Sequence, residues 1–333
     1  MPETYDVVVS SPFPNYDFFA HRMMEQCGQM NLTFFMVNDV WINEFLAKVE
    51  SGDVVVRVLL DLTANQPLEN DPYTRLAKAV KKRGAFVMDD PDKTAIVAHK
   101  GKFHDILVVQ GVPVPETVVV SREEAETFKI TDEIKKRLGV PFVVKPAWGD
   151  SGIGVVVNAK SEEDLQRSVR EAPVSDAFLL QRMVRPKKLG EHFGWFRMYH
   201  ICGRVIPCWW NQQSHEYHLV TPGQQRRYKL APLKRVMMGI AQASKMAKFS
   251  SEICMEEDGN FVAVDYVNAD PDMNPRSFYP NGVPDEVVRY IVWLLFHEAL
   301  RYVKKRQGFF DEDLFEAEGG WLEQRRLQQT TPN

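Results

Sequence analysis

Short hydrophobic runs alternate with helical periodicity near the start of the chain. Residues 6–10, 54–60 and 85–88 are brief aliphatic runs with the β-branched content of buried strands. Residues 73–82, between the last two runs, repeat apolar positions at the spacing of an amphipathic helix. Strands that alternate with helices form parallel sheets covered by helices, so we predict an N-terminal α/β domain over residues 1–97.

From residue 98 onward the pattern predicts a smaller α+β unit, which we place at residues 98–181. A helical stretch over residues 98–109 ends at Gly111, and prolines then keep the chain extended. Short apolar runs and amphipathic stretches follow, and they predict antiparallel strands at 117–120, 142–144, 155–157 and 178–181 with helices at 123–138 and 161–170.

A third, larger unit is predicted over residues 182–306. It has strands at 197–201 and 205–209, a helix at 232–248, a hairpin, and a helix that starts near Pro284. Charged residues interrupt this last apolar helix, so we expect a core helix and not a membrane span. Residues 307–333 are charged and rich in glutamine, and we expect a peripheral tail there.

The hairpin brings two acidic residues together. Asp258-Gly259 is typical of a two-residue turn, because both central positions of a type I′ turn need a positive φ. With that turn, Glu257 faces Asn260, and Glu252 lies directly opposite Asp265. The other face then holds four apolar residues, which we expect to turn to the core: Ile253, Met255, Val262 and Val264.

Two facing carboxylates repel each other, because the Cβ atoms of an antiparallel pair lie about 4.5–5.5 Å apart. A divalent cation held by Glu252 and Asp265, with a further oxygen from Asn268, would offset that repulsion. Because these ligands are all oxygens, Mg²⁺ or Mn²⁺ is favoured over zinc. A solvated acidic hairpin is the alternative, and Asp270 and Asp272 are either further ligands or turn residues.

A glycine-bearing loop joins two predicted strands over residues 142–155. Lys145 ends the first strand, and the loop that follows holds small residues at Gly149, Ser151, Gly152 and Gly154. Glycines let backbone N–H groups approach phosphate oxygens, and a serine hydroxyl can donate as well. A strand and not a helix follows, so the loop is neither a P-loop nor a Rossmann turn. An ordinary hairpin turn is the alternative.

The order of these motifs resembles the ATP-grasp superfamily, which includes D-alanine ligases, glutathione synthetases and ribosomal-protein glutamate ligases. Lys100 precedes a Gly111-Val-Pro-Val-Pro115 segment, the glycine loop with Lys145 follows, and the acidic hairpin comes last. The resemblance implies an ATP-grasp fold, mixed α/β and α+β, with an N-terminal parallel-sheet domain and with ATP between the second and third units.

The resemblance also implies roles by position. Lys100 and Lys145 would bind the phosphates of ATP, with Lys102 in place of Lys100 if the register slips by two residues. Arg197 would face the γ-phosphate or the substrate, and Arg197 and Lys145 would act in catalysis. Further nucleotide contacts would come from the glycine-bearing loop, at Gly149, Ser151, Gly152 and Gly154. The segment that joins the second and third units would contribute Gln181, Arg182, Met183 and Val184, and Glu191 would bind the ribose.

The predicted metal ligands depart from the family pattern in one respect. The family usually has Glu-x-Asn, whereas this chain has one residue more between Asp265 and Asn268. Strand alternation therefore places Asn268 on the wrong face unless a β-bulge corrects it.

By resemblance, the chain is a ligase that joins a small-molecule carboxylate to an amine or thiol through an acyl phosphate, with ATP and Mg²⁺ (or Mn²⁺). A small-molecule kinase and a regulatory module that binds ATP without turnover stay open. The net charge of −4 argues against nucleic acid as a partner. The N-terminus lacks the pattern of a signal peptide, so we expect a cytoplasmic protein without a membrane partner. Monomer and homodimer stay open.

Overall fold

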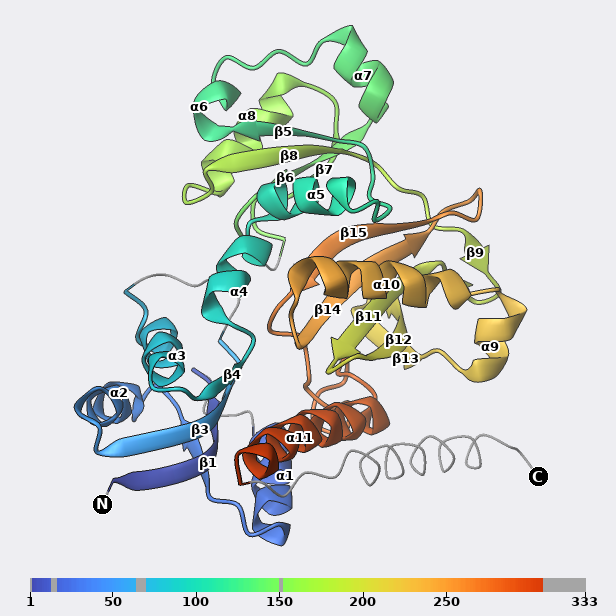
Figure 1. Cartoon of the computed structure of the whole chain (residues 1–333). Helices are drawn as coiled ribbons and strands as arrows, with labels where there is room; N and C mark the ends of the chain where they lie inside the picture. Colours follow the sequence, from blue (N-terminus) through green and yellow to red (C-terminus); the bar gives the residue numbers. More distant parts are fainter. Residues whose placement is uncertain (1, 13–16, 64–69, 150–151, 308–333) are drawn as a thin grey trace.

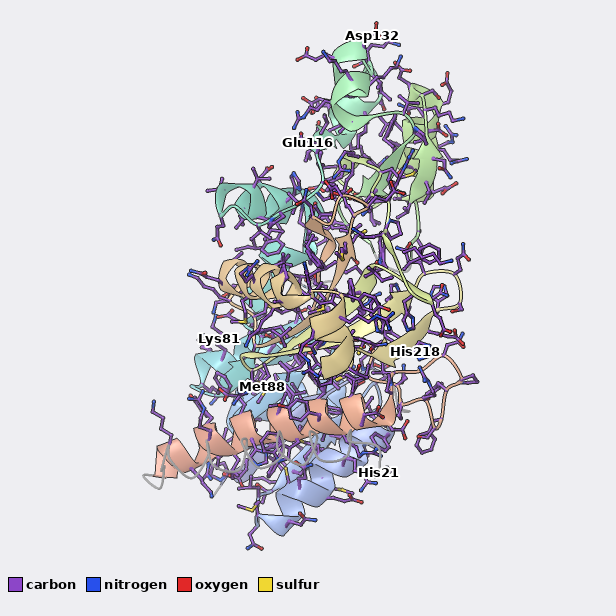
Figure 2. All side chains as sticks on the ribbon, turned by 90° about the vertical axis from the view of Figure 1, so that its right-hand side faces the viewer. His21, Lys81, Met88, Glu116, Asp132 and His218 are labelled. Carbon is purple, nitrogen blue, oxygen red and sulfur yellow. The ribbon has the colours of Figure 1, made fainter. Side chains whose placement is uncertain are left out.

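The computed structural model of the chain describes residues 2–12, 17–63, 70–149 and 152–307. The described residues form four sheets, one of them the two-stranded pair β10-β9. The three larger sheets lie in three bodies stacked from the N-terminal part to the small antiparallel part (Figure 1). Figure 2 shows Glu116 and Asp132 of the small body at one end of the molecule and His21 of the first helix at the other. Ser151 and residues 308–333 of the predicted tail lie outside the described residues, and Gln307 is the last residue of a helix.

The N-terminal sheet is parallel, with strand order β2-β1-β3-β4. Its elements alternate as predicted: β1 (Glu3–Ser10), α1 (Asp17–Gln29), β2 (Phe34–Val37), α2 (Ile42–Ser51), β3 (Val54–Asp61), α3 (Pro72–Lys82) and β4 (Phe86–Met88). Helix α3 begins where the Asp71 carboxylate accepts from the N–H of Thr74, and Pro72 suits the first turn. The mixed fold class with a parallel N-terminal sheet is confirmed, although β2 was not predicted.

The small lobe consists of a four-stranded antiparallel sheet and its helices, and the chain enters it through two helices. The strand order is β5-β8-β6-β7. The elements are α4 (Pro91–Ala98), α5 (Lys100–Val109), β5 (Thr117–Ser121), α6 (Arg122–Ala125), α7 (Asp132–Leu138), β6 (Phe142–Pro146), β7 (Val156–Ala159), α8 (Glu162–Glu171) and β8 (Ala177–Arg182).

Two helices of this region begin at caps that the hydrophobic pattern did not reveal. His99 has an extended backbone between α4 and α5, and its Nδ1 accepts from the N–H of Lys102 at 3.1 Å. Thr131 caps α7 in the same way, so the single helix predicted at 123–138 is wrong and two short helices stand there. The cap at His99 places Lys100 at the first position of α5.

The large lobe has a five-stranded antiparallel sheet with order β13-β12-β11-β14-β15. Its elements are β9 (Lys188–Leu189), β10 (His192–Phe193), β11 (Trp195–Ile201), β12 (Arg204–Asn211), β13 (Glu216–Leu219), α9 (Pro222–Arg227), α10 (Ala231–Ser244), β14 (Lys248–Met255) and β15 (Phe261–Asn268). Alternation along β11 turns Phe196 and Met198 to the core under α10, whereas Tyr199 and Ile201 face the opposite side.

Helix α11 (Asp285–Gln307) joins the large lobe to the N-terminal sheet. Val288, Ile291 and Leu295 are fully buried in a cluster that also contains Val58 of β3 and Tyr199 of β11. The prediction of a core helix is therefore confirmed. Within the described ranges, none of the helices is both long and apolar enough to cross a membrane.

A buried ion pair ties the end of the N-terminal sheet to β14. The Nζ of Lys248 lies 3.5 Å from Oδ2 of Asp89 and donates to the carbonyl of Ala269 at 2.6 Å, and both charged side chains are completely buried. Asp89 Oδ1 also accepts from the backbone N–H groups of Ala247 and Lys248.

Replacement of Lys248 by methionine should destabilise the protein by about 3–5 kcal/mol, because the Asp89 carboxylate is then buried without its cation. Urea unfolding measures this free energy. The matched variant Lys248→Met/Asp89→Asn keeps the acceptor at Asp89 but removes its charge, and we expect it to recover at least about 1 kcal/mol of the loss. Equal losses in both variants would contradict this account.

Candidate active site

Glu252 and Asp265 face each other across β14 and β15, as predicted, but through a different turn. The N–H of Glu256 donates to the carbonyl of Asn260, which closes a three-residue loop in which Gly259 has a φ of +91°. The predicted two-residue turn, with Glu257 facing Asn260, is therefore wrong. The strand pairs shift by one residue next to the turn, and a bulge between Glu252 and Ile253 restores the predicted pair.

The bulge also changes which apolar side chains reach the core. Ile253 and Met255 pack under α10 as predicted, together with Phe261 and Ala263. Val262 packs on the other side of the sheet and Val264 lines a cavity there, so their predicted placement is wrong.

A cavity of about 460 Å³ lies between the two lobes on the face that carries Glu252 and Asp265. Predicted site residues from both lobes line it: Lys100, Lys145, Gly149, Gly152, Gln181, Arg182, Met183, Val184, Glu252 and Asp265. Four separate segments of the chain, from α5 to β15, therefore meet at one cavity.

Two lysines of the small-lobe side point into this region. The Nζ of Lys100 donates to the carbonyl of Gly149 in the glycine loop at 2.5 Å. The Nζ of Lys145 donates to Oε1 of Gln181 at 2.9 Å and, across the lobes, to the carbonyl of Val264 at 3.1 Å. Burial lowers the pKa of Lys145, and the nearby carboxylates oppose that shift without cancelling it.

Arg197, Glu252 and Asp265 form a row across three adjacent strands. Arg197 of β11 pairs with Glu252 of β14, which in turn pairs with Asp265 of β15. The Nη2 of Arg197 lies 2.6 Å from Oε1 of Glu252, and Trp195 Nε1 donates to Oε2 at 2.9 Å. The Arg197 guanidinium also lies over the ring of Trp210, 5.0 Å from its centroid.

Opposite charges decide the protonation of Asp265. Burial raises the pKa of its carboxyl, but Lys100, Lys145 and Arg197 together lower it by more. The net pKa of Asp265 therefore lies below the usual value of 3.8. Burial lowers the pKa of Arg197, but nearby groups, Glu252 first among them, raise it by more, and the net pKa lies above the usual value. Asp265 and Arg197 are therefore both charged at neutral pH.

The donor set fits a hard divalent cation. Asn268 pairs with Ser250 through a second irregularity of the hairpin, and its Oδ1 is buried without a hydrogen-bond partner in the described part of the chain. Asp265, Glu252 and Asn268 together offer only oxygen atoms, which suits Mg²⁺. Residues 2–12, 17–63, 70–149 and 152–307 contain no group of three or more His, Cys, Asp and Glu side chains able to bind a metal.

Several predicted residues lie apart from the cavity lining. Arg197 and Asn268 are among them, although Arg197 is bonded to Glu252 of the lining. Glu191 is exposed in the turn between β9 and β10, and Lys102 is exposed on α5. Gly154 is packed tightly, since a Cβ there would lie 2.8 Å from Cβ of Ala172 and 2.9 Å from Cγ of Pro146. Its role in the structure is close packing under the loop. Ser151 lies outside the described residues.

The sequence did not single out Trp195 and Gln212, which line the cavity beside Glu252. Gln212 Nε2 lies 3.5 Å from Oε2 of Glu252. Trp195 could have been found, because it stands two residues before Arg197 on a strand and so shares its face. The polar loop around Gln212 has no periodicity, so its position depends on the fold.

A tyrosine that the sequence also missed supports the cavity from behind. Tyr266 OH accepts from Nε2 of Gln181 at 3.0 Å and lies 2.7 Å from Nδ1 of His104. Because Gln181 holds Lys145, these buried bonds connect α5 and β15 to the lysine.

Comparisons with known proteins agree with this architecture. A family model for the C-terminus of D-Ala-D-Ala ligase matches residues 106–186. D-alanine–D-alanine ligase from Bacillus anthracis, complexed with ATP, superposes with a TM-score of 0.62 at 13% identity over 92% of this chain and 99% of that chain. The chain therefore has the ATP-grasp fold, and the resemblance predicted from its motifs is confirmed.

Two further structures have the same fold. A RimK domain ATP-grasp protein from Sphaerobacter thermophilus DSM 20745 has a TM-score of 0.58 at 18% identity, over 86% of this chain and 98% of that chain. The ATP-grasp ligase PsnB, complexed with a minimal precursor, Mg and ADP, has a TM-score of 0.58 at 15% identity, over 90% and 98%. A search of curated protein sequences found no match.

Asp265→Asn should be less stable than the wild type at neutral pH in metal-free buffer, because it leaves three cations with one carboxylate fewer. A lowered pKa in the folded state contributes stability above the unfolded value of 3.8, and this contribution is lost as pH falls through the folded pKa. Thermal unfolding from about pH 7 to about pH 3 should therefore show the difference shrinking below about pH 4. A difference that stays constant with pH would rule out this role of the charge.

Proposed function

We propose that the chain is an ATP-dependent ligase that joins a small-molecule carboxylate to an amine or thiol and releases ADP and phosphate. The main support is the cavity between the lobes, where Lys100 and Lys145 meet Glu252 and Asp265, with Arg197 bonded to Glu252. Cations that can neutralise a triphosphate stand beside oxygen ligands for Mg²⁺. The protein would act in the cytoplasm on soluble substrates.

The lysines would bind phosphate oxygens from the small-lobe side. The carbonyl of Gly149, which now accepts from Lys100, lies in the loop whose backbone N–H groups can contact the same phosphates. Lys145 is held in place by Gln181 and Val264 before any ligand binds, so little side-chain entropy is lost on binding. Met183 and Val184 line the cavity at the segment between the lobes, where the adenine ring would lie.

Arg182 would keep that segment in place. Its guanidinium forms two bonds to the Glu256 carboxylate, at 2.7 and 2.9 Å, and so joins the end of β8 to the base of the hairpin. Its proposed nucleotide contact is therefore through its backbone.

Arg197 would stabilise the charge that develops during phosphoryl transfer. A substrate carboxylate oxygen attacks the γ-phosphorus, the bond to the ADP oxygen breaks, and an acyl phosphate forms. The amine then attacks the acyl carbon, the carbon–nitrogen bond forms, and phosphate leaves with the former carboxylate oxygen while the amine loses a proton. Glu252, Asp265 and Asn268 would hold Mg²⁺, which neutralises phosphate charge when bound.

The protein incubated with ATP and Mg²⁺ and with mixed carboxylate and amine pools should release ADP. Hydroxylamine in place of the amine should convert an acyl phosphate into a hydroxamate, which forms a coloured iron complex. We expect Lys145→Met to lower the rate about 10²–10³-fold, because it removes a preorganised cation. A stable phosphorylated product without hydroxamate would indicate a kinase, and ATP binding without ADP release would indicate a regulatory module.

Lys100→Met should weaken binding of ATP with Mg²⁺ about 10–100-fold, because a charge-assisted hydrogen bond to phosphate is lost. Isothermal titration calorimetry measures the dissociation constant. Lys102→Met is the matched control, since Lys102 lies on the same helix but is exposed, and it should change the constant by about twofold or less. A larger loss of ATP affinity in Lys102→Met than in Lys100→Met would mean that Lys102 is the phosphate ligand.

A further inference from the structure

A second large concavity, which we name the β4–α10 groove, lies away from the cavity between the lobes. It has a volume of about 960 Å³ and is formed by four parts of the chain that are distant in sequence. Its walls come from α3 and β4 up to the start of α4, from the end of β11 and the turn after it, from α10 with the residues that follow it, and from α11. The residues used below are Lys81, Phe86, Lys93, Arg235, Met238, Lys245, Met246 and Tyr302.

The floor of the groove is aromatic and apolar. Phe86 stacks on Tyr302 with ring centroids 4.5 Å apart, and Met238, which also lines the groove, is 38% exposed. Strand β4 is the outermost strand of the N-terminal sheet, so the groove runs along a sheet edge. Proteins usually cover such an edge with another segment, because its backbone groups otherwise attract other chains.

The rim of the groove is basic. Lys81 is already paired with Asp90 and Asp92, and Asp89 with Lys248. Within the residues that the structure describes, no ion pair joins Lys93, Arg235 or Lys245 to a carboxylate. These three cations, from two sides of the groove, therefore favour an acidic occupant. In the view of Figure 2, Lys81 of α3 and Met88 of β4 are labelled near each other, on the same side of α11.

The sequence that follows α11 has the complementary chemistry. Residues 308–324 contain six Asp and Glu residues, at positions 311, 312, 313, 316, 318 and 323, and neither lysine nor arginine. Aromatic and aliphatic residues stand among the acids: Phe309, Phe310, Leu314, Phe315, Trp321 and Leu322. An acidic segment with aromatic anchors matches an aromatic floor with a basic rim.

The groove is also within reach. Tyr302 lines it, and α11 ends five residues later at Gln307, which corresponds to about 7.5 Å of helix. Seventeen extended residues can span roughly 55 Å, more than the turn back into the groove requires. We propose that residues 308–324 dock in the β4–α10 groove of the same chain, with their acidic residues on Lys93, Arg235 and Lys245 and their aromatic residues on Phe86, Met238 and Tyr302.

This docking would cover the free edge of β4 and connect the N-terminal sheet to α10 of the large lobe. The docking proposal does not depend on the proposed ligase activity, because none of the groove residues lines the cavity between the lobes. The segment is acidic, so its attachment should weaken as salt screens the charges.

Limited digestion of the full-length chain by chymotrypsin tests the docking, since the enzyme cleaves after the aromatic residues of the segment. The variant Arg235→Glu/Lys245→Glu should be cleaved within residues 308–324 about tenfold faster than the wild type, because two attractions become repulsions. Lys234→Glu is the matched control, because Lys234 is exposed on α10 next to Arg235 but does not line the groove, and it should leave the rate unchanged.

A charge swap makes the test specific. Adding Asp311→Lys/Glu312→Lys/Asp313→Lys to the groove variant should return the cleavage rate toward that of the wild type, whereas the same three changes alone should raise it. Thermal unfolding of each variant confirms that the fold is intact. Cleavage as fast in the wild type as in the groove variant would overturn the proposal. So would protection that rises with protein concentration, because the occupant would then be the segment of a second copy.

Discussion

Two carboxylates that face each other on neighbouring strands can persist only if cations surround them. Glu252 and Asp265 meet this condition through Arg197 on the next strand and through two lysines that reach over from the other lobe. The positions of β6, α5 and β11 relative to the hairpin are therefore constrained by charge as well as by packing. Moving any one of them away would leave buried carboxylates without a counter-charge, which is far less favourable than losing a surface contact.

The rest of the molecule holds these elements in register. Helix α11 packs between the large sheet and the N-terminal sheet, and the Lys248–Asp89 pair fixes the start of β14 against the end of β4. The strand that carries Glu252 is thus anchored at one end by a buried ion pair and at the other by the Arg182–Glu256 bonds. A site made of four sequence segments can keep its geometry because each segment belongs to a rigid element.

The sequence was most informative where a physical rule links residues that are close along the chain. Alternation and turn chemistry predicted the pairing of Glu252 with Asp265, but two errors cancelled. The turn has one residue more than predicted, and a bulge beside Glu252 compensates. A bulge inserts one residue into one strand only, and a hydrophobic pattern does not reveal where that happens. Strand β2 was missed although its four residues are all apolar, because so short a run does not by itself distinguish a strand from a helix. At His99 and Thr131, capping interrupts a stretch that the hydrophobic pattern reads as one helix.

The motif order predicted the ATP-grasp fold because each motif stands at the end of an element, where topology fixes its position. Glu191 and Lys102 illustrate the limit of that inference, since a match by spacing alone says nothing about which side of a turn or helix faces the cavity. Trp195 and Gln212 show the converse, as neither belongs to a motif although both contact Glu252.

The bond from Lys145 to the carbonyl of Val264 has a consequence for motion between the lobes. The lysine belongs to β6 of the small lobe and its acceptor to β15 of the large lobe, so the bond spans the cleft itself. Any hinge rotation that widens the cleft must break this bond and at the same time remove a positive charge from Asp265. Opening of the lobes therefore changes the electrostatic potential at the bottom of the cleft. An anionic ligand that binds Lys145 in place of the Val264 carbonyl would favour the open arrangement, whereas one that binds cations of both lobes at once would favour the closed one.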